Sequence, residues 1–285
     1  MFVDIEACKA WLGRSTEDVD IITPRLLAEY RVTFDPFLAD IIGNDVPLGF
    51  HWCLSPFLAP SRELGRDGHP AKGGFLPPVP LPRRMWAGGT IDYPGDLRLG
   101  DSVRRRSTIA SIDLKQGSSG PLCFVGVRHD YQTERGIAIS EVQNIVYREE
   151  PSDRQRPTVS SPGDAQIEET SLLESSWTVT PTSTMLFRYS ALTFNGHRIH
   201  YDYPYATSAE GYAGLVVHGP MQATLMLNLA AASRRAMPRR FTYRGLAPLT
   251  ADQPFLVRLQ HAEKSLACFT QVAGGSINMQ GEATW

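Results

Sequence analysis

One segment of this 285-residue chain, Pro220–Ala236, predicts a helix that must be buried. Its sequence, PMQATLMLNLAAASRRA, is largely apolar all round and rich in alanine, whereas a surface helix carries a polar face. Pro220 suits the first helical position, where a missing backbone amide costs nothing. A helix of this kind needs other elements around it, and we therefore expect the rest of the chain to wrap it.

Segments with strand character lie on either side of this helix in the sequence. β-branched and aromatic residues with partial alternation predict two groups of antiparallel strands separated by turn residues. The first group is RRMWAGGTIDY, SVRRRSTIASIDLK, LCFVGVRHDYQT and GIAISEVQNIVYRE, and the second is TSTMLFRYSALT, FTYRGLAPL, FLVRLQHAE, SLACFTQVAG and SINMQGEATW. Both groups accompany irregular or helical material, so the two halves share a plan that indicates an internal duplication of architecture.

Two further stretches precede the first group of strands. Residues 4–30 predict one or two amphipathic helices, with a favourable helix start at Thr23-Pro24. Residues 43–82 are rich in proline and glycine, which excludes long regular structure. Because large side chains such as His51 and Trp52 lie within that stretch, we expect an ordered loop.

A third stretch, residues 150–175, has the composition of a linker. It is polar, contains proline and is poor in aromatic side chains. We therefore expect an N-terminal half at residues 1–149 and a C-terminal half at residues 176–285.

Charge and cysteine content exclude several classes of function. Lys and Arg (28) nearly balance Asp and Glu (30), so no overall field favours nucleic acid or a membrane. The first twenty residues carry acids early and have no sustained apolar core, so we do not expect them to be a signal peptide, and no apolar run reaches the roughly 18 residues of a membrane span. The four cysteines are widely scattered, which argues against a disulfide framework and for a reducing compartment: Cys8, Cys53, Cys123 and Cys268. We expect a soluble cytoplasmic protein.

The segment YSALTFNGHRIHYDYPYA carries the chemistry. It places His197 and His200, two of the seven histidines, beside Asn195 and Asp202. Histidine is the usual proton-transfer group near neutral pH. The structural alternative for this segment alone is a polar, tyrosine-rich surface loop.

A second signal follows shortly in the sequence. His218 and Gly219 immediately precede Pro220, so Gly219 presents its backbone amide at the N-terminus of the buried helix. Such an amide can polarise a carbonyl oxygen, and glycine lets a ligand approach the backbone closely. Taken alone this is an ordinary helix start, but together the two segments predict an active site.

With these motifs the chain resembles the MaoC-like acyl-thioester hydratases and dehydratases. That family has an aspartate, an asparagine two residues later and a histidine five residues after the aspartate; this register falls on Asn195, His197 and His200. The subgroup of long members that read F-N-x-H-R-I-H-Y-D is the most similar, and it also matches FHWCLSP, LPRRMWAGG and HGPMQATLM. It includes itaconyl-CoA and mesaconyl-CoA hydratases and mitochondrial-type 3-hydroxyacyl-thioester dehydratases. The resemblance spans most of the chain and implies an α+β double hot-dog fold, in which two antiparallel sheets each wrap a central helix.

This sequence departs from the general family at one important position. Asn195 stands where the family has its aspartate, and an amide can orient water but cannot take its proton. In one hypothesis His200 alone shuttles the proton while Asn195 holds the water. In the other, Asp202 supplies the missing carboxylate, because strand alternation would place it on the same face as His200 if this stretch is extended.

The resemblance also implies roles for the other polar residues. The amide of Gly219 would bind the thioester carbonyl, and His200 would deprotonate the attacking water. His197 would orient the loop or the substrate. Further residues are expected to bind the substrate, with the arginines as partners for a carboxylate or a CoA phosphate: Arg84, Trp86, Arg198, Tyr201 and His218.

The expected reaction is the reversible hydration of an α,β-unsaturated acyl-CoA, preferably itaconyl-CoA or mesaconyl-CoA. The alternatives are a 3-hydroxyacyl-thioester dehydratase of fatty-acid metabolism and a non-catalytic acyl-thioester-binding protein. A thioesterase is disfavoured because the helix Pro220–Ala236 has no Asp or Glu. We expect one active site per chain, because residues 1–149 lack an N-x-H-x-x-H segment and would instead shape the acyl pocket. We also expect a homodimer without a cofactor, and without a metal because His197 and His200 lack a convincing third ligand.

Overall fold

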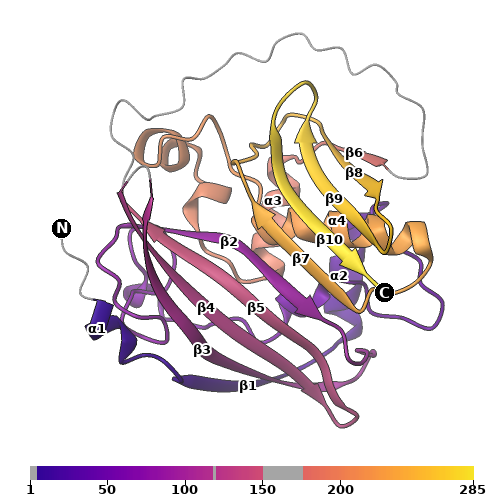
Figure 1. Ribbon diagram of the computed structural model, residues 1–285, viewed down its shortest axis with the longest axis horizontal. Coiled ribbons are helices and arrows are strands. Elements are labelled where there is room, and N and C mark those ends of the chain that lie inside the picture. The colour runs from indigo at the N-terminus through magenta and orange to yellow at the C-terminus, as the bar shows by residue number, and fades with distance from the viewer. Residues whose placement is uncertain (1–4, 118–119, 150–175) are drawn as a thin grey trace.

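The computed structural model describes residues 5–117, 120–149 and 176–285 (Figure 1). Within these residues, ten antiparallel strands form one continuous sheet in the order β1-β3-β4-β5-β2-β7-β10-β9-β8-β6. This order is symmetric about the β2–β7 pair, because every strand of the first half has a counterpart at the equivalent place in the second. The duplicated architecture expected from the sequence is therefore present in the sheet.

The elements have the following bounds. The strands are β1 (Ser15–Ile21), β2 (Arg83–Asp92), β3 (Ser102–Gly117), β4 (Gly120–Thr133), β5 (Gly136–Arg148), β6 (Ser176–Val179), β7 (Arg240–Gly245), β8 (Phe255–His261), β9 (Ser265–Val272) and β10 (Ile277–Thr284). The α-helices are α1 (Ile5–Lys9), α2 (Pro24–Phe34), α3 (Ser183–Leu192) and α4 (Gly219–Arg234). Short 3₁₀ turns are η1 (Phe50–Cys53), η2 (Ser61–Glu63) and η4 (Arg198–His200), and η5 (Tyr205–Ala209) is a turn of π-helix.

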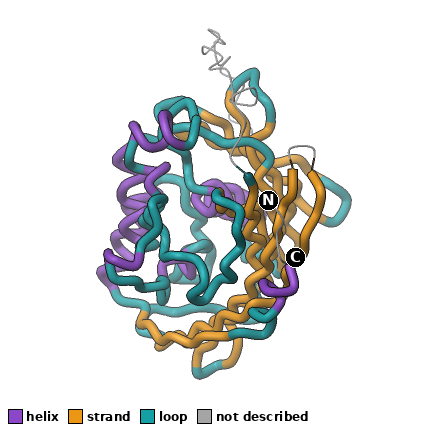
Figure 2. Tube along the Cα trace, turned by 90° about the vertical axis from the view of Figure 1, so that its left-hand side faces the viewer, coloured by secondary structure: helices purple, strands orange, loops and turns teal. Residues whose placement is uncertain are grey.

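Helix α4 is the centre of the core. Every residue from Pro220 to Ala231 is buried, which confirms the prediction of a buried helix. Most of the helical and loop segments gather on one side of the sheet (Figure 2). Between α2 and β2 the first half has only the short turns η1 and η2, so only the second half has the long central helix expected of each. The sheets of the two halves join at β2 and β7 into one sheet.

The halves join through the backbones of β2 and β7. Gly88 and Gly89 lie at this junction, where Gly89 pairs with Tyr243. A Cβ atom at Gly88 would lie 2.3 Å from the carbonyl oxygen of Tyr243, and one at Gly89 would lie 2.7 Å from its hydroxyl oxygen. Glycine is needed here because any side chain would push the two halves apart.

Most of the sequence-based predictions are confirmed. The strands expected in the first group are β2 to β5, and the last four expected in the second are β7 to β10. Thr23 caps α2 by accepting a hydrogen bond from the amide of Leu26, and Pro24 is the first helical residue. The stretch 43–82 forms loops and turns with the short helices η1 and η2 and one isolated bridge between Leu64 and Pro70. The expected linker 150–175 lies outside the described residues, and the division at that linker stays a prediction.

Two predictions of secondary structure are wrong. Residues 182–193, expected as a strand, form α3, because Thr182 caps the amide of Met185 and the buried residues recur at helical spacing. Residues 15–21, expected in a helix, form the edge strand β1, which pairs with β3 along its whole length. The short strand β6 was not expected.

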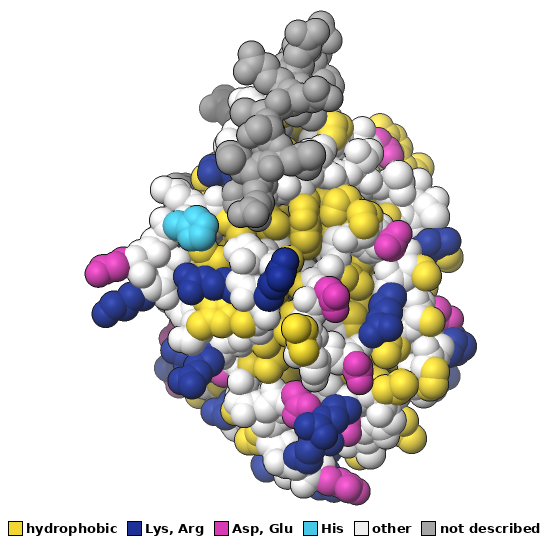
Figure 3. Space-filling model, turned by 90° about the vertical axis from the view of Figure 1, so that its right-hand side faces the viewer, with side chains coloured by type: hydrophobic (Ala, Val, Ile, Leu, Met, Phe, Trp, Pro, Cys, Tyr) yellow, Lys and Arg dark blue, Asp and Glu magenta, His cyan; other side chains and the backbone are white. Residues whose placement is uncertain are grey.

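On the face shown in Figure 3, positive and negative side chains are mixed. There Lys and Arg side chains are interspersed with Asp and Glu, and hydrophobic side chains lie between them. Among the helices of the described residues, none has the length and apolar character needed to cross a membrane.

One polar side chain ties the buried helix to the first half. Asn228 donates a hydrogen bond of 3.0 Å to the carbonyl of Leu48 and accepts one of 3.1 Å from the amide of Ala39. Both partners lie in the loop that follows α2. The side chain therefore holds this loop against α4.

Replacing Asn228 by alanine should lower the free energy of unfolding by about 1–3 kcal/mol, because the amide of Ala39 loses its acceptor and the carbonyl of Leu48 loses a donor. Urea denaturation measures the change. Asn144→Ala, at an exposed position of β5, is the matched control and should stay within about 0.5 kcal/mol of wild type. Equal effects of the two substitutions would contradict this account of the helix.

Candidate active site

The histidine-bearing segment forms a series of tight turns after α3. Phe194 adopts a left-handed conformation with a φ of 50°, and the side-chain oxygen of Asn195 accepts a hydrogen bond of 3.0 Å from the amide of His197. The side-chain NH₂ group of Asn195 makes no hydrogen bond to any described residue. Asn195 therefore shapes the turn with its oxygen and keeps its NH₂ group available to hold a water.

His200 ends the turn η4 and is docked beside the start of α4. Its Nδ1 lies 2.7 Å from the carbonyl oxygen of Val216, and the amide of Val216 donates to the carbonyl of Ile199. Since a carbonyl oxygen only accepts, Nδ1 of His200 carries the hydrogen and Nε2 is left as an acceptor. Burial lowers the pKa of His200 to about 3, so the imidazole is neutral at neutral pH.

Four histidine rings form a continuous cluster. The ring of His200 stacks on that of His218 with centroids 3.6 Å apart, and it lies 5.4 Å from the ring of His197. The ring of His69, from the first half, lies 4.2 Å from that of His197. Burial is the main cause that lowers the pKa of His69, His197 and His218 as well. The cluster is therefore an uncharged set of imidazoles.

Helix α4 begins against this cluster. His218 precedes the helix, and its Nε2 lies 2.8 Å from the hydroxyl oxygen of Ser190 on α3. Gly219 is the first helical residue, so its amide is one of those that have no partner within the helix. A Cβ atom at Gly219 would lie 3.7 Å from the methyl carbon of Met279 and 4.0 Å from Trp86. The glycine leaves a partly exposed amide beside the histidines.

The first half contributes a loop that the sequence analysis did not identify as functional. Asp67 accepts hydrogen bonds of 3.1 Å from both the amide and the ring Nδ1 of His69. A Cβ atom at Gly68 would lie 2.0 Å from the carbonyl oxygen of Gly196, so the two loops touch backbone to backbone. The only sequence signal was a histidine in a proline- and glycine-rich loop, and nothing local in the sequence indicates this long-range contact.

The same residues are the set that could hold a metal ion. Asp67, His69 and His197 each offer one ligand atom, and these atoms lie within 4.8 Å of one another. The expectation of no metal was argued from His197 and His200; in the structure His197 is instead joined by Asp67 and His69, and the absence of a metal stays a prediction. However, the guanidinium of Arg84 lies 3.9 Å from the carboxylate of Asp67, and its charge opposes that of a cation. We therefore treat Asp67 and His69 as a hydrogen-bonded pair.

Asp202 lies away from the position expected for it. Residues 198–200 form a 3₁₀ turn, so the expectation that Asp202 and His200 share a face of an extended strand is wrong. One carboxylate oxygen of Asp202 accepts hydrogen bonds from Arg198, and the other accepts one from the amide of Tyr205. These bonds lower the pKa of Asp202, and the bond from Tyr205 holds the first residue of η5 in place.

Two other predicted residues have structural partners in the same loop. Besides its pair with Asp202, the guanidinium of Arg198 donates to the carbonyl of Arg66 and lies over the ring of Tyr205 at 4.2 Å. The hydroxyl of Tyr201 donates to the carbonyl of Gly196. Arg198 thus joins the loops of the two halves and is not a free receptor for a substrate anion.

Strand β2 brings Arg84 and Trp86 to the site. They are two residues apart and so face the same side of the sheet. The side chain of Arg84 is only 10% exposed and lies beside Asp67. The indole of Trp86 donates a hydrogen bond of 3.0 Å to the hydroxyl of Tyr243 and its backbone lies next to Gly219.

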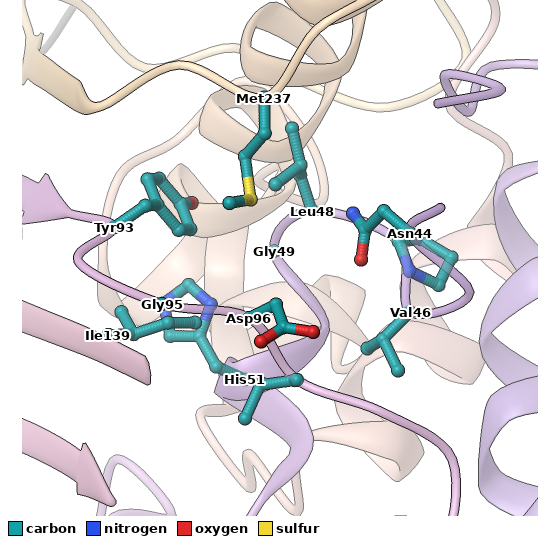
Figure 4. Close-up of a pocket in the computed structure, with 12 residues that line it drawn as sticks. Asn44, Val46, Leu48, Gly49, His51, Tyr93, Gly95, Asp96, Ile139 and Met237 are labelled. Atoms are coloured by element: carbon teal, nitrogen blue, oxygen red, sulfur yellow. The ribbon is translucent and has the colours of Figure 1, made fainter. Parts of the chain in front are cut away.

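A separate small cavity is lined mainly by the first half, with Met237 from the second (Figure 4). Its lining includes His51, Tyr93, Leu48, Ile139 and Met237, and in Figure 4 the side chain of Met237 ends beside Tyr93. The hydroxyl of Tyr93 is buried without a hydrogen-bond partner, and the ring of His51 lies 3.5 Å from the buried carboxylate of Glu141. None of the lining residues belongs to the histidine cluster around His200.

Comparison with known proteins identifies the family to which a chain with this site is similar. Residues 49–251 match the family model described as hydroxyacyl-thioester dehydratase type 2. The mesaconyl-C(4)-CoA hydratase of Chloroflexus aurantiacus is 42% identical over 249 residues, which are 86% of this chain and 86% of that protein. The mitochondrial hydroxyacyl-thioester dehydratase type 2 of Schizosaccharomyces pombe is 28% identical over 235 residues, 73% of this chain and 76% of the relative.

Solved structures agree on the fold. A MaoC-like dehydratase from Phytophthora capsici has a TM-score of 0.65 at 13% identity and covers 99% of both chains. HtdX of Mycobacterium tuberculosis has a TM-score of 0.66 at 15% identity, with 95% of this chain and 98% of that chain covered. A further protein of the same organism, described as a double hot-dog fold, has a TM-score of 0.54 at 13% identity and covers 96% of both chains. The α+β double hot-dog class is therefore confirmed.

The buried neutral histidines predict a loss of stability in mild acid. In the unfolded chain a histidine takes up a proton near pH 6.5, whereas the folded state keeps His200 and His218 neutral well below that pH. Below pH 6.5 the unfolded state therefore binds more protons, and each such histidine lowers the free energy of unfolding by about 1.4 kcal/mol per pH unit.

Urea denaturation at pH 7.5 and pH 5.5 tests this. The wild type should be less stable at pH 5.5. Replacing His261, which is exposed at the end of β8, by glutamine should leave the difference unchanged. Equal stability of the wild type at the two pH values would contradict burial of neutral histidines.

Proposed function

This chain belongs to the hydroxyacyl-thioester dehydratase type 2 family, and we propose that it catalyses the reversible addition of water to an α,β-unsaturated acyl-CoA. It is an enzyme of the hydro-lyase class. The observation that carries the proposal is His200, a buried, neutral imidazole with Nδ1 fixed on the carbonyl of Val216 and Nε2 left as an acceptor. Its ring stacks on that of His218, the residue before Gly219. This is the pairing of a base with an oxyanion donor that water addition to an enoyl thioester requires.

The amide of Gly219 would bind the thioester carbonyl oxygen. As water attacks the β-carbon, negative charge moves onto this oxygen, and the free amide and the positive end of α4 both stabilise it. The absence of a side chain at Gly219 permits close approach, since Trp86 and Met279 already border this position.

His200 and Asn195 would handle the water. Nε2 of His200 removes one proton as the oxygen bonds to the β-carbon, and the NH₂ group of Asn195 holds the oxygen in place. His200 then gives the proton to the α-carbon, which restores the neutral imidazole. His197 would orient the loop, consistent with the hydrogen bond that its backbone amide donates to the side-chain oxygen of Asn195.

We propose a C5 dicarboxylic enoyl-CoA as the preferred substrate, with mesaconyl-CoA and itaconyl-CoA as the candidates. The similarity to the Chloroflexus aurantiacus enzyme supports the mesaconyl thioester. Arg84 supports the class, because a largely buried guanidinium beside the site can pair with the free carboxylate of such a substrate. The second candidate function is dehydration of a 3-hydroxyacyl thioester in fatty-acid metabolism, which the similarity to the Schizosaccharomyces pombe protein favours.

We also propose that the enzyme acts in the cytoplasm as a homodimer. The four cysteines are free and buried, as suits a reducing compartment. Strands β1 and β6 end the sheet, and each presents one row of backbone groups that a second chain can pair with.

Incubation with a panel of enoyl-CoA esters tests the reaction. Loss of the conjugated thioester absorbance without release of thiol is the expected result, whereas thiol release would indicate hydrolysis. His200→Ala should lower kcat by about 10²–10⁴-fold, as for loss of a general base. Asn195→Ala should have a smaller effect in the same direction. His261→Ala is the matched control. A His200→Ala enzyme that kept most of the wild-type turnover would contradict the role of His200 as the general base.

Arg84→Met tests the substrate class. Loss of one charged hydrogen-bonding partner should raise KM for mesaconyl-CoA about 10–100-fold, which corresponds to about 1.5–3 kcal/mol. Crotonyl-CoA has no second carboxylate and serves as the internal control, with KM expected to change little. An equal rise in KM for both thioesters would exclude carboxylate recognition by Arg84.

A further inference from the structure

In the proposed function, protonation of His200 puts an unfavourable charge into the histidine cluster. When His200 takes the proton of water, a positive charge appears among rings that burial keeps neutral. Position 195, where relatives of the wider MaoC-like family place an aspartate, carries a neutral amide here. Asp202 is committed to Arg198 and Tyr205. A counter-charge from elsewhere is needed to make this proton transfer favourable.

Asp67 is a carboxylate that contacts the cluster. Its Oδ2 lies 3.1 Å from Nδ1 of His69, and the ring of His69 lies 4.2 Å from that of His197. His197 in turn lies 5.4 Å from His200. Hydrogen bonds from His69 and the charge of Arg84 hold the pKa of Asp67 below its usual value despite its partial burial, so it is ionised at neutral pH.

The loop that carries Asp67 is fixed to the histidine segment. The carbonyl of Asp67 accepts a hydrogen bond of 2.9 Å from the amide of Arg198, and the carbonyl of Arg66 accepts one of 3.0 Å from the guanidinium of Arg198. Gly68 and Gly196 meet backbone to backbone in the same contact. These contacts set the place of the carboxylate relative to His197 and His200, although the two loops are far apart in the sequence.

We propose that Asp67, held through His69, is the carboxylate of this active site and replaces the one absent at position 195. The inference rests on the proposed function. Asp67 and His69 are positioning residues: they act through His197 and His200 and do not need to touch the substrate. The N-terminal half thus completes the chemistry and does more than shape the acyl pocket.

The step balances without any further reactant. The O–H bond of water breaks as its oxygen bonds to the β-carbon, and the proton goes to Nε2 of His200. The electron pair of the C=C bond moves to the α-carbon and the thioester carbonyl. While the proton is held, the cluster carries one positive charge and the enolate of the thioester one negative charge, and Asp67 stays an anion beside His69. The proton then forms the new C–H bond at the α-carbon.

The test is steady-state kinetics of hydration for four variants in the presence of a metal chelator, which removes any effect of a bound metal. Asp67→Asn keeps the size of the side chain and removes its charge. His69→Gln removes the link to the cluster. Asp67→Asn combined with Asn195→Asp returns a carboxylate to the position used by the wider family. Asp130→Asn is the matched control, since Asp130 is also partly buried and paired with an arginine, but on β4.

The proposal predicts a fall in kcat of about 100-fold for Asp67→Asn and for His69→Gln, because proton transfer to His200 loses its counter-charge. KM and the melting temperature should change little. The double variant should regain at least tenfold in kcat over Asp67→Asn, because an aspartate at position 195 can still accept the hydrogen bond from the amide of His197. A purely structural role of Asp67 would not produce this rescue. Asp130→Asn should stay within twofold of wild type.

Either of two results would overturn the inference: a kcat of Asp67→Asn within threefold of wild type, or no gain in kcat from adding Asn195→Asp. If the wild type is active and one of these is seen, only this inference fails. A wild-type protein that hydrates no enoyl-CoA of the panel would overturn the proposed function and this inference together.

Discussion

The structure depends on helix α4, whose apolar side chains must be shielded from water on every side. Because α4 is buried from Pro220 to Ala231, neither half alone can provide its cover. The sheet therefore runs without a break from β1 to β6, and the loop after α2 is held against α4 by Asn228. The same constraint brings loops from both halves together at the N-terminus of α4, where the free amide of Gly219 lies. The position of the site follows from the burial of the helix.

Burial also determines the chemistry of the site. An imidazole that is shielded from water stays neutral, so His200 is ready to accept a proton at neutral pH, but its protonated form is costly. A carboxylate near the cluster lowers that cost during the reaction. In this chain the C-terminal half carries Asn195 in place of the carboxylate, while the N-terminal half brings Asp67 and His69 to the rings. The two halves thus each bring side chains to the proposed site: His200 and Asn195 come from one, and the positioning residues Asp67 and His69 from the other.

Local patterns were sufficient to predict α4, eight of the ten strands and the candidate residues Asn195, His200 and Gly219. They failed where local preference and tertiary packing disagree. Residues 182–193 contain β-branched and aromatic side chains, yet they form α3 because its buried face packs on α2, where the rings of Phe34 and Tyr189 meet at 5.7 Å. Asp67 and His69 were missed for a different reason. Their proposed role depends on a contact with residues that are remote in the sequence, and no local pattern shows that contact.

A crystal structure of the His200→Ala variant with a bound enoyl-CoA tests the central claim most directly, because that variant should bind the thioester but turn it over slowly. We predict the thioester oxygen within about 2.7–3.1 Å of the amide nitrogen of Gly219. The β-carbon should face the NH₂ group of Asn195 and the space left by the imidazole. A thioester bound elsewhere, for example in the cavity beside His51, would contradict an active site at the start of α4.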